Sequence, residues 1–333
     1  MKKEEQNNLI ALKNYENFIY KQQPVILNSS LSQLRYLILT EGLPEIINHS
    51  NNTNIRLHVW SILLQCSMVN CTTKYLKLLG KGPPPIKIYD KIKNDTFRTL
   101  NTDVEFKTKV AEASLIRCLS CFSWGILERE TEMGTEMGTE RGIEREERLS
   151  TYVQGMNVLL APLLYISNGL EPMAFQLFNK LCRYHIPTYL DRNLTGVYKG
   201  CQLVEICLFI IDPTLSKFLR QEHLLTAEIY GVPSILTLSA CTPPLHQVIK
   251  LWDFMFAYGF HMNLLFIVAQ LVLIRTELLN NPSPINFLNN LPPFNAEDVI
   301  RLGVGFLAKI PDDIYELLVT HLYNYDVAIP NML

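Results

Sequence analysis

The sequence predicts an all-α protein. Apolar residues recur at the helical spacing of three and four residues along most of the chain, and helix-start and helix-stop residues separate these stretches. The alternation of apolar and polar residues that is typical of strands is scarce. A chain of 333 residues with 48 % hydrophobic and 19 % charged residues can bury a substantial core, in one large domain or two fused lobes.

Composition also excludes several classes of function. The formal net charge of −2 gives no electrostatic reason to expect a nucleic acid or an anionic membrane as partner. The eight cysteines form no paired framework, and the single C-x-x-C of Cys118 and Cys121 lacks a second pair, so we expect reduced core cysteines in a cytosolic compartment. The N-terminus has no apolar signal core. The longest apolar run, residues 262–274, contains Asn263 and Gln270 and is too short to span a bilayer, which indicates a buried helix and no transmembrane segment.

The first hundred residues read as a polar lead followed by short helices. Residues 1–29 form the lead, with one helix expected over residues 9–20. A helical pattern begins at about residue 30 and ends at Gly42. A polar loop over residues 48–54 supplies a cap for the next helix. The Gly- and Pro-rich stretch 80–85 is a break and not a phosphate loop, because it lacks the G-x-x-x-x-G-K-[ST] spacing and its prolines remove amide donors.

The middle of the chain contains a helix-capping signal and, after it, a repetitive charged segment whose composition differs from that of its neighbours. Thr102 and Glu105 have the spacing of a capping box, which predicts a helix running to about Trp124. Residues 128–148 then contain three tetrapeptides of the form Thr-Glu-(Met or Arg)-Gly and many charged residues. Glycine at every fourth position disfavours a helix, so we expect a solvated, low-complexity acidic insertion that is mostly disordered.

Helix after helix is expected from residue 157 onward. Starts are predicted at Glu171, at about Val197, at the Asp212–Pro213 pair, at Pro233 and after the Pro243–Pro244 pair, with a stop at Gly259 and caps at Asn295 and Asp312.

Two polar motifs stand out against this helical background. Ile92, Asp95 and Arg98 are spaced by three residues and would share one face of a helix. Gln154 and Gly155 lie at the mouth of an apolar helix, where a glutamine could hold a water molecule or point into a partner's cleft and the glycine permits close backbone approach. Taken alone, such a Gln-Gly pair is also typical of a simple cap or turn.

Together these motifs resemble those of TBC-domain proteins, the GTPase-activating proteins of Rab-like GTPases. The matching stretches are I-x-x-D-x-x-R-T at residues 92–99, Y-V-Q-G-M-N at residues 152–157, and an Arg four residues before a Trp at Arg56 and Trp60. Residues 252–259 resemble the family's W-D-x-x-x-x-x-G segment. The sequences of residues 34–39, 157–162 and 230–245 are similar to those of the fungal checkpoint branch, which restrains mitotic exit and septation. The resemblance covers residues 30–330 and implies a TBC fold over 30–333, with an N-lobe of about 30–200 and a C-lobe of about 201–333.

The resemblance implies a division of roles among the motif residues. Arg98 would be an arginine finger and Gln154 a water-positioning glutamine, both supplied to a small Ras- or Rab-like GTPase. Asp95 and Thr99 would brace Arg98, Tyr152, Gly155 and Asn157 would shape the Gln154 loop, and Arg56 is expected to be structural. GTP and Mg²⁺ would belong to the GTPase, so no cofactor or metal is expected on this chain. Branch members work as two-component activators with a second protein at the spindle pole body.

Other functions stay open at this point. The runner-up is a membrane-trafficking Rab activator, and a catalytically silent helical scaffold of the same ancestry is a further alternative. An independent enzyme is disfavoured, because the sequence contains no G-x-S-x-G and no H-E-x-x-H motif and its seven histidines lack ligand spacing.

Overall fold

A computed structural model describes residues 27–44, 55–133 and 148–330. Its elements are α2 (Leu27–Glu41), α3 (Ile55–Leu63), α4 (Cys71–Leu79), α5 (Ile86–Thr96), α6 (Val104–Lys109), α7 (Glu112–Met133), α9 (Met156–Ser167), α10 (Glu171–Lys180), η2 (Leu181–His185), η3 (Pro187–Tyr189), α11 (Thr195–Ile211), α12 (Pro213–Lys217), η4 (Phe218–Glu222), α13 (Ala227–Tyr230), α14 (Val232–Leu236), α15 (Leu245–Tyr258), α16 (Met262–Leu273), α17 (Arg275–Leu279), α18 (Pro284–Leu288), α19 (Ala296–Phe306), η5 (Leu307–Lys309) and α20 (Asp312–Thr320). The predicted all-α class is confirmed, since within these residues the sole β pairing is an isolated bridge between Leu149 and Asp191.

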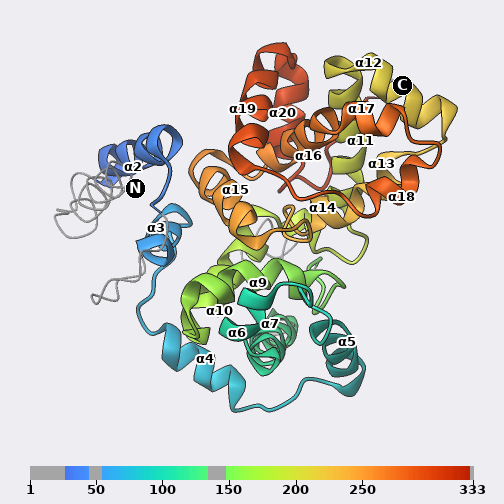
Figure 1. The fold of residues 1–333 in the computed structure, drawn as a ribbon. Helices are drawn as coiled ribbons and strands as arrows, with labels where there is room; N and C mark the ends of the chain where they lie inside the picture. Colours follow the sequence, from blue (N-terminus) through green and yellow to red (C-terminus); the bar gives the residue numbers. More distant parts are fainter. Residues whose placement is uncertain (1–26, 45–54, 134–147, 331–333) are drawn as a thin grey trace.

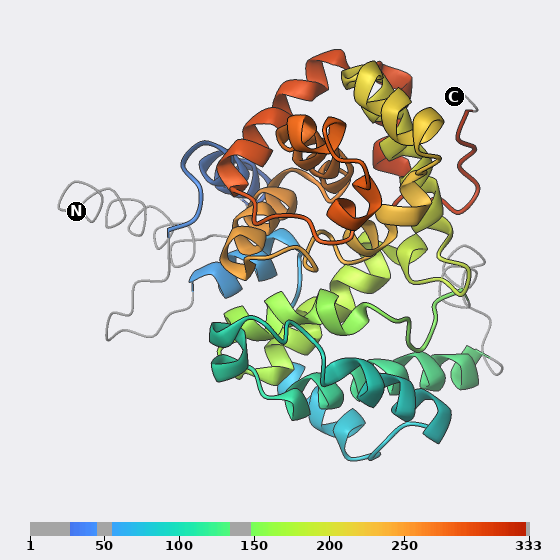
Figure 2. The same cartoon turned by 45° about the vertical axis from the view of Figure 1, so that its right-hand side comes forward.

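The helices form two packed lobes, as expected (Figure 1). The lower lobe in Figure 1 contains α4 to α7 with α9 and α10, and the upper lobe contains α11 to α20. Turning the molecule by 45° keeps the two groups apart, with α9 lying where they meet (Figure 2). Helices α2 and α3 pack against α15 of the upper lobe, and α3 also contacts α9. The structure thus places the N-terminal helices at the junction of the lobes.

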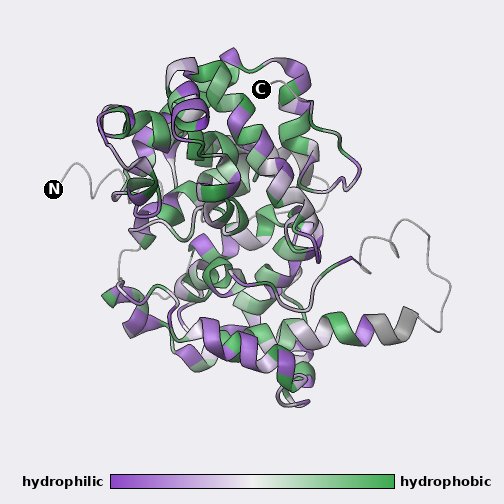
Figure 3. Ribbon diagram, turned by 90° about the vertical axis from the view of Figure 1, so that its right-hand side faces the viewer, coloured by the Kyte–Doolittle hydropathy of each residue, from purple (hydrophilic) through white to green (hydrophobic). Residues whose placement is uncertain are grey.

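The core is mainly apolar, and many of the polar side chains buried in it are hydrogen-bonded. Hydrophobic residues run through the interior of both lobes, while hydrophilic residues gather on outer helices and loops (Figure 3). Helix α16 is buried along its whole length except near its C-terminus, which confirms the expected buried helix. Its Asn263 accepts from Ser239 Oγ at 2.7 Å and donates to the Ser234 carbonyl at 3.1 Å, so the amide joins α16 to the α14 region without an unpaired polar group. No helix in the described ranges is long and apolar enough to cross a membrane.

Most of the expected helix boundaries are confirmed. Helix α2 ends just before Gly42, whose φ of +70° needs the left-handed region. Asp212 caps α12 by accepting from Leu215 N at 2.9 Å, and Asn295 caps α19 by accepting from Asp298 N at 3.1 Å. The Pro-rich break separates α4 from α5, and its Gly82 carbonyl accepts from Trp124 Nε1 at 2.9 Å, which packs the loop onto α7.

Three expected boundaries are wrong. The capping residue of α6 is Asp103, which accepts from Phe106 N at 2.8 Å, whereas Glu105 bonds to Lys109 and Tyr165 and cannot close a box with Thr102. The helix expected to reach Trp124 is two helices, because Val110 is extended between α6 and α7.

At the C-terminal end, Pro311 is the N-cap of α20 and Asp312 is its first helical residue. Asp312 therefore contributes charge to the first turn and no cap.

Helix α7 extends into the first residues of the predicted acidic segment. Helix α7 continues to Met133, several residues past position 128, because the local disfavour of Thr and Gly takes effect only after the helix is already propagating from its buried part. Residues 134–147, the expected helix 9–20 and the expected loop 48–54 lie outside the described residues. After that gap the Arg148 guanidinium lies over the Tyr325 ring at 4.8 Å. Cys118 and Cys121 are buried on α7, and all eight cysteines are free thiols.

Candidate functional site

The Gln154 motif sits in a turn that leads into α9. Gln154 itself is exposed and makes no hydrogen bond to a described residue. Gly155 has a φ of +106°, and a Cβ at this position would lie 2.9 Å from Leu236 Cδ2 of α14. The backbone conformation therefore favours glycine, and the other lobe approaches this position closely. The turn holds Gln154 at the surface beside the junction of the two lobes.

The second motif lies at the C-terminal end of α5. Ile92 is fully buried and anchors this helix, which packs against α7 and α9. Three residues on, the buried Asp95 carboxylate accepts from Arg98 Nη2. The Arg98 side chain is 53 % exposed and makes no other hydrogen bond within the described part of the chain. Since a guanidinium carries five N–H donors in a planar fork, Arg98 retains donors for a ligand outside the protein.

Direct hydrogen bonds join the two motifs although more than fifty residues separate them in sequence. The Tyr152 hydroxyl donates to Asp95 Oδ2 at 2.7 Å, so one carboxylate bonds to both the arginine segment and the glutamine segment. Asn157, in the first turn of α9, donates to the Asp95 carbonyl at 3.1 Å and to Thr99 Oγ1 at 2.8 Å. Thr99 in turn donates to the Asp95 carbonyl at 3.2 Å. Asp95, Thr99, Tyr152 and Asn157 thus form one connected network next to the two exposed side chains.

Burial and hydrogen bonding determine the protonation state of Tyr152 in this network. Burial of the Tyr152 ring, together with the bond to the Asp95 carboxylate, raises the pKa of Tyr152 far above its usual range. The phenol therefore stays protonated and remains a donor. Asp95 can then accept from Tyr152 and Arg98 at once, which limits the rotation of the carboxylate and the positions open to the guanidinium.

Arg56 lies apart from this network and has the structural environment expected of it. Arg56 is 6 % exposed, and its Nε and Nη2 donate to the Asp253 carboxylate at 2.9 Å each. Trp60 Nε1 donates to Asp253 Oδ1 at 2.8 Å, and the Trp60 ring stacks on Phe256 with a centroid distance of 4.4 Å. Burial raises the pKa of Asp253, and the opposing effect of Arg56 only partly offsets it. This cluster fastens α3 to α15 and presents no charge to solvent.

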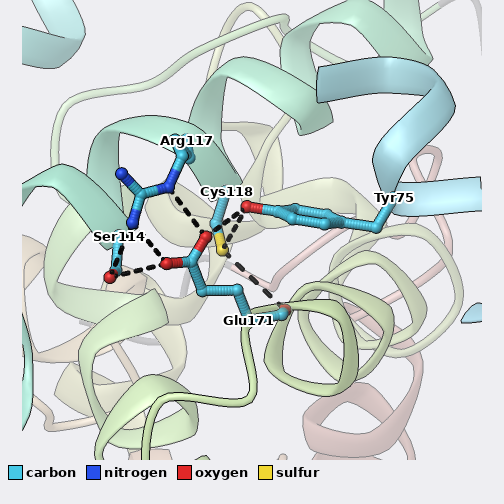
Figure 4. Close-up of polar contacts among 5 residues, drawn as sticks. All are labelled: Tyr75, Ser114, Arg117, Cys118 and Glu171. Atoms are coloured by element: carbon cyan, nitrogen blue, oxygen red, sulfur yellow. Dashed lines mark hydrogen bonds and ion pairs between the residues drawn. The ribbon is translucent and has the colours of Figure 1, made fainter. Parts of the chain in front are cut away.

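The sequence reasoning missed a second, partly buried polar cluster in the lower lobe. Figure 4 shows the Glu171 carboxylate at the centre of Tyr75, Ser114 and Arg117, with Cys118 beside it. Tyr75 donates to Glu171 Oε2 at 2.6 Å, Ser114 to Oε1 at 2.8 Å and Arg117 Nε to Oε2 at 2.9 Å. Partial burial favours the neutral acid, but these three donors outweigh it and lower the pKa of Glu171. The cluster joins α4, α7 and α10, and Glu171 was recognisable in the sequence only as a helix start.

Within the described residues, no group of three or more His, Cys, Asp and Glu side chains is placed to hold a metal ion. The candidate site consists of an exposed guanidinium, an exposed carboxamide and a buried network that links their backbones. Such a pair can donate hydrogen bonds to an anionic ligand carried by another molecule.

Comparison with known proteins agrees with this geometry. The Rab-GTPase-TBC domain family matches residues 53–279, a span that contains every motif residue above. Over 309 residues the chain is 58 % identical to the mitotic check point protein BUB2 of Saccharomyces cerevisiae, covering 92 % of this chain and 96 % of that protein. It is 35 % identical over 299 residues to the cell division control protein 16 of Schizosaccharomyces pombe, covering 90 % of each chain.

Among solved structures, the Ypt/Rab-GAP domain of Gyp1p superposes with a TM-score of 0.69 at 17 % identity, covering 90 % of this chain and 98 % of that domain. This likeness establishes the fold. The family match and the two relatives go further: the chain belongs to the Rab-GTPase-TBC domain family, as a GTPase-activating protein of the branch that contains the yeast mitotic checkpoint proteins.

Proposed function

We propose that this chain stimulates GTP hydrolysis by a small Ras- or Rab-like GTPase by inserting Arg98 and Gln154 into the partner's active site. The observation that carries the proposal is the hydrogen-bond network of Asp95, Tyr152, Asn157 and Thr99, which supports both side chains from one buried base. Both ends of the network that would meet a partner are exposed.

The chemistry needs these two groups in particular. GTP hydrolysis passes through a loose transition state whose charge is spread over the phosphate oxygens, and an arginine supplied in trans is worth roughly 10³–10⁵ in rate. Arg98 would donate to those oxygens with the N–H groups that Asp95 does not use. Gln154 would orient the attacking water, because a carboxamide donates and accepts at the same time. GTP and Mg²⁺ would be held by the GTPase.

The buried network would act as the positioning element. Asp95 limits where the Arg98 guanidinium can lie, and Tyr152 transmits that position to the turn carrying Gln154. Gly155 lets this turn contact Leu236 of the other lobe. The two catalytic groups would therefore approach the nucleotide with a spacing that is set before the partner binds, which lowers the entropic cost of assembling the site.

The relatives support a cellular role. One is named a mitotic check point protein and the other a cell division control protein. By their similarity this chain would restrain mitotic exit and septation, working with a second activator subunit at the spindle pole body. The partner GTPase would then be one that triggers cell division.

The test is a single-turnover hydrolysis assay over a panel of purified small GTPases loaded with GTP, with the full chain added. Arg98→Ala, Arg98→Lys and Gln154→Ala should each reduce stimulated hydrolysis on the order of 10²-fold or more while circular dichroism stays unchanged. Lys is included because a point charge lacks the planar fork that spans two oxygens. Folded variants that hydrolyse at the wild-type rate would refute the mechanism and favour a silent scaffold. Stimulation confined to trafficking GTPases would place the chain with the membrane-trafficking activators.

A further inference from the structure

Positive charge is concentrated in the part of the chain that carries Arg98. Residues 71–110 contain nine Lys or Arg and four Asp or Glu, whereas the whole chain has 30 basic and 32 acidic residues. These residues make up α4, α5 and α6 of the lower lobe, with their connections. The net charge of the chain therefore hides a basic stretch of sequence, and α5 carries the part of this stretch that leads to the proposed active arginine.

Helix α5 aligns part of this charge with Arg98. At 3.6 residues per turn, positions 87, 91 and 98 fall within about 40° of one another around the helix axis. Phe97 retains helical dihedrals of −63° and −23° after α5 ends at Thr96, so the row continues to Arg98. Lys87 and Lys91 are exposed and form no ion pair within the described residues. Along the axis they lie about 16 Å and about 10 Å from Arg98, at 1.5 Å per residue.

An exposed aromatic residue directly precedes the arginine in the sequence. Phe97 is 64 % exposed, and Ile86 at the other end of α5 is 67 % exposed. They are eleven positions apart, so both fall on a second row, about 100° around the helix axis from the lysine row. Large aromatic side chains near the centre of an interface commonly supply much of its binding energy.

We propose that the exposed side of α5 is the recognition surface for the GTPase, with Lys87 and Lys91 steering an acidic patch beside the partner's nucleotide and Phe97 entering an apolar depression. This inference rests on the proposed role of Arg98. An interface of standard size covers about 800 Å² per partner, which is a disc of about 16 Å radius. Centred on Arg98, such a disc includes Phe97 and Lys91 and reaches Lys87 at its rim.

The two kinds of residue should act on different steps of binding. Rim charges change the association rate and its salt dependence, because they act on the approaching partner over roughly the Debye length. A buried aromatic anchor changes the dissociation rate, because its contacts exist only in the formed complex.

The test uses the full chain and the GTPase that it stimulates most in the panel above. The double variant Lys87→Glu/Lys91→Glu is compared with Lys217→Glu/Lys309→Glu, which makes the same charge change on exposed lysines of the other lobe. At about 0.05 M salt the first variant should lower kcat/KM roughly tenfold or more, and the deficit should shrink at about 0.3 M salt. The control should stay within about twofold of wild type under both conditions, since its charges lie outside the interface. Saturating kcat should not change in either.

Phe97→Ala should raise the dissociation rate of the complex roughly tenfold at both salt concentrations, with circular dichroism unchanged. Equal salt dependence in the two double variants, or an unchanged dissociation rate for Phe97→Ala, would overturn the recognition surface. Arg98→Ala would still reduce stimulated hydrolysis on the order of 10²-fold or more in that case, and the proposed function would stand. If Lys87→Glu/Lys91→Glu instead loses binding to anionic lipid vesicles but keeps full stimulation of GTP hydrolysis, the surface binds a membrane and not the GTPase. Absence of stimulation with every GTPase would overturn both proposals.

Discussion

The buried pair of Arg56 and Asp253 gives the sharpest prediction about stability. Asp253→Ala leaves a guanidinium that is 6 % exposed without its carboxylate, although Arg56 makes one more bond, to the Pro44 carbonyl at 3.4 Å. Breaking a buried pair by removing one partner costs about 3–5 kcal/mol. The substitution also removes the acceptor of Trp60 Nε1, and a buried unsatisfied donor costs about 1–3 kcal/mol. Because neighbouring losses are not additive, we expect a decrease of about 4 kcal/mol or more in the free energy of unfolding.

The measurement is urea denaturation followed by far-UV circular dichroism and by tryptophan fluorescence, since Trp60 and Trp252 flank the pair with a centroid distance of 5.8 Å. The thermal midpoint should fall on the order of 10 °C. Arg56→Met combined with Asp253→Leu should recover at least about half of the loss, because apolar replacement of both partners is often close to neutral.

Arg98→Ala is the matched control, because it removes the arginine of the other motif. Its side chain is half exposed, and Asp95 keeps the bond from Tyr152, so the loss should not exceed about 1 kcal/mol. A loss below about 1 kcal/mol for Asp253→Ala, or equal losses for the two arginines, would refute the assignment of Arg56 to structure and Arg98 to the surface.

Three further predictions follow from the described residues. Burial lowers the pKa of His185, His261 and His321 to about 4, below the usual 6.5. Each should therefore contribute stability above pH 6.5 that is lost as the pH falls toward 4, up to about 3 kcal/mol per histidine. Urea unfolding midpoints measured between these pH values check this. Gly155→Ala should cost about 1–3 kcal/mol and lower stimulated hydrolysis, because its φ of +106° and the 2.9 Å approach to Leu236 both oppose a Cβ; unchanged stability and activity would contradict this reading. Removing residues 135–147 should leave the free energy of unfolding within about 2 kcal/mol, since their sequence has no apolar face to bury, and a larger drop in a denaturation curve would assign them to the core.

Much of the helical framework was readable from local signals. Gly42, Asp212, Asn295 and Gly259 mark helix ends because caps and stops depend on atoms a few residues apart. The same locality explains the errors. The capping box was expected at Thr102 and Glu105, but the Glu105 side chain bonds to Tyr165 on a helix distant in sequence, and Asp103 caps α6 instead. The extended Val110 between α6 and α7 is buried in the core, which no capping signal reports.

For the candidate site too, local sequence signals and tertiary packing determined different features. By itself the sequence determined an all-α chain and the residue types of two motifs, because periodicity and motif spacing are properties of neighbouring residues. Only the tertiary structure decided that Tyr152 and Asn157 reach Asp95, that Leu236 closes on Gly155, and that the partner of Arg56 is Asp253, 197 residues away. Such pairings depend on how the lobes pack, since a buried donor must find its acceptor wherever close packing brings one within hydrogen-bond distance.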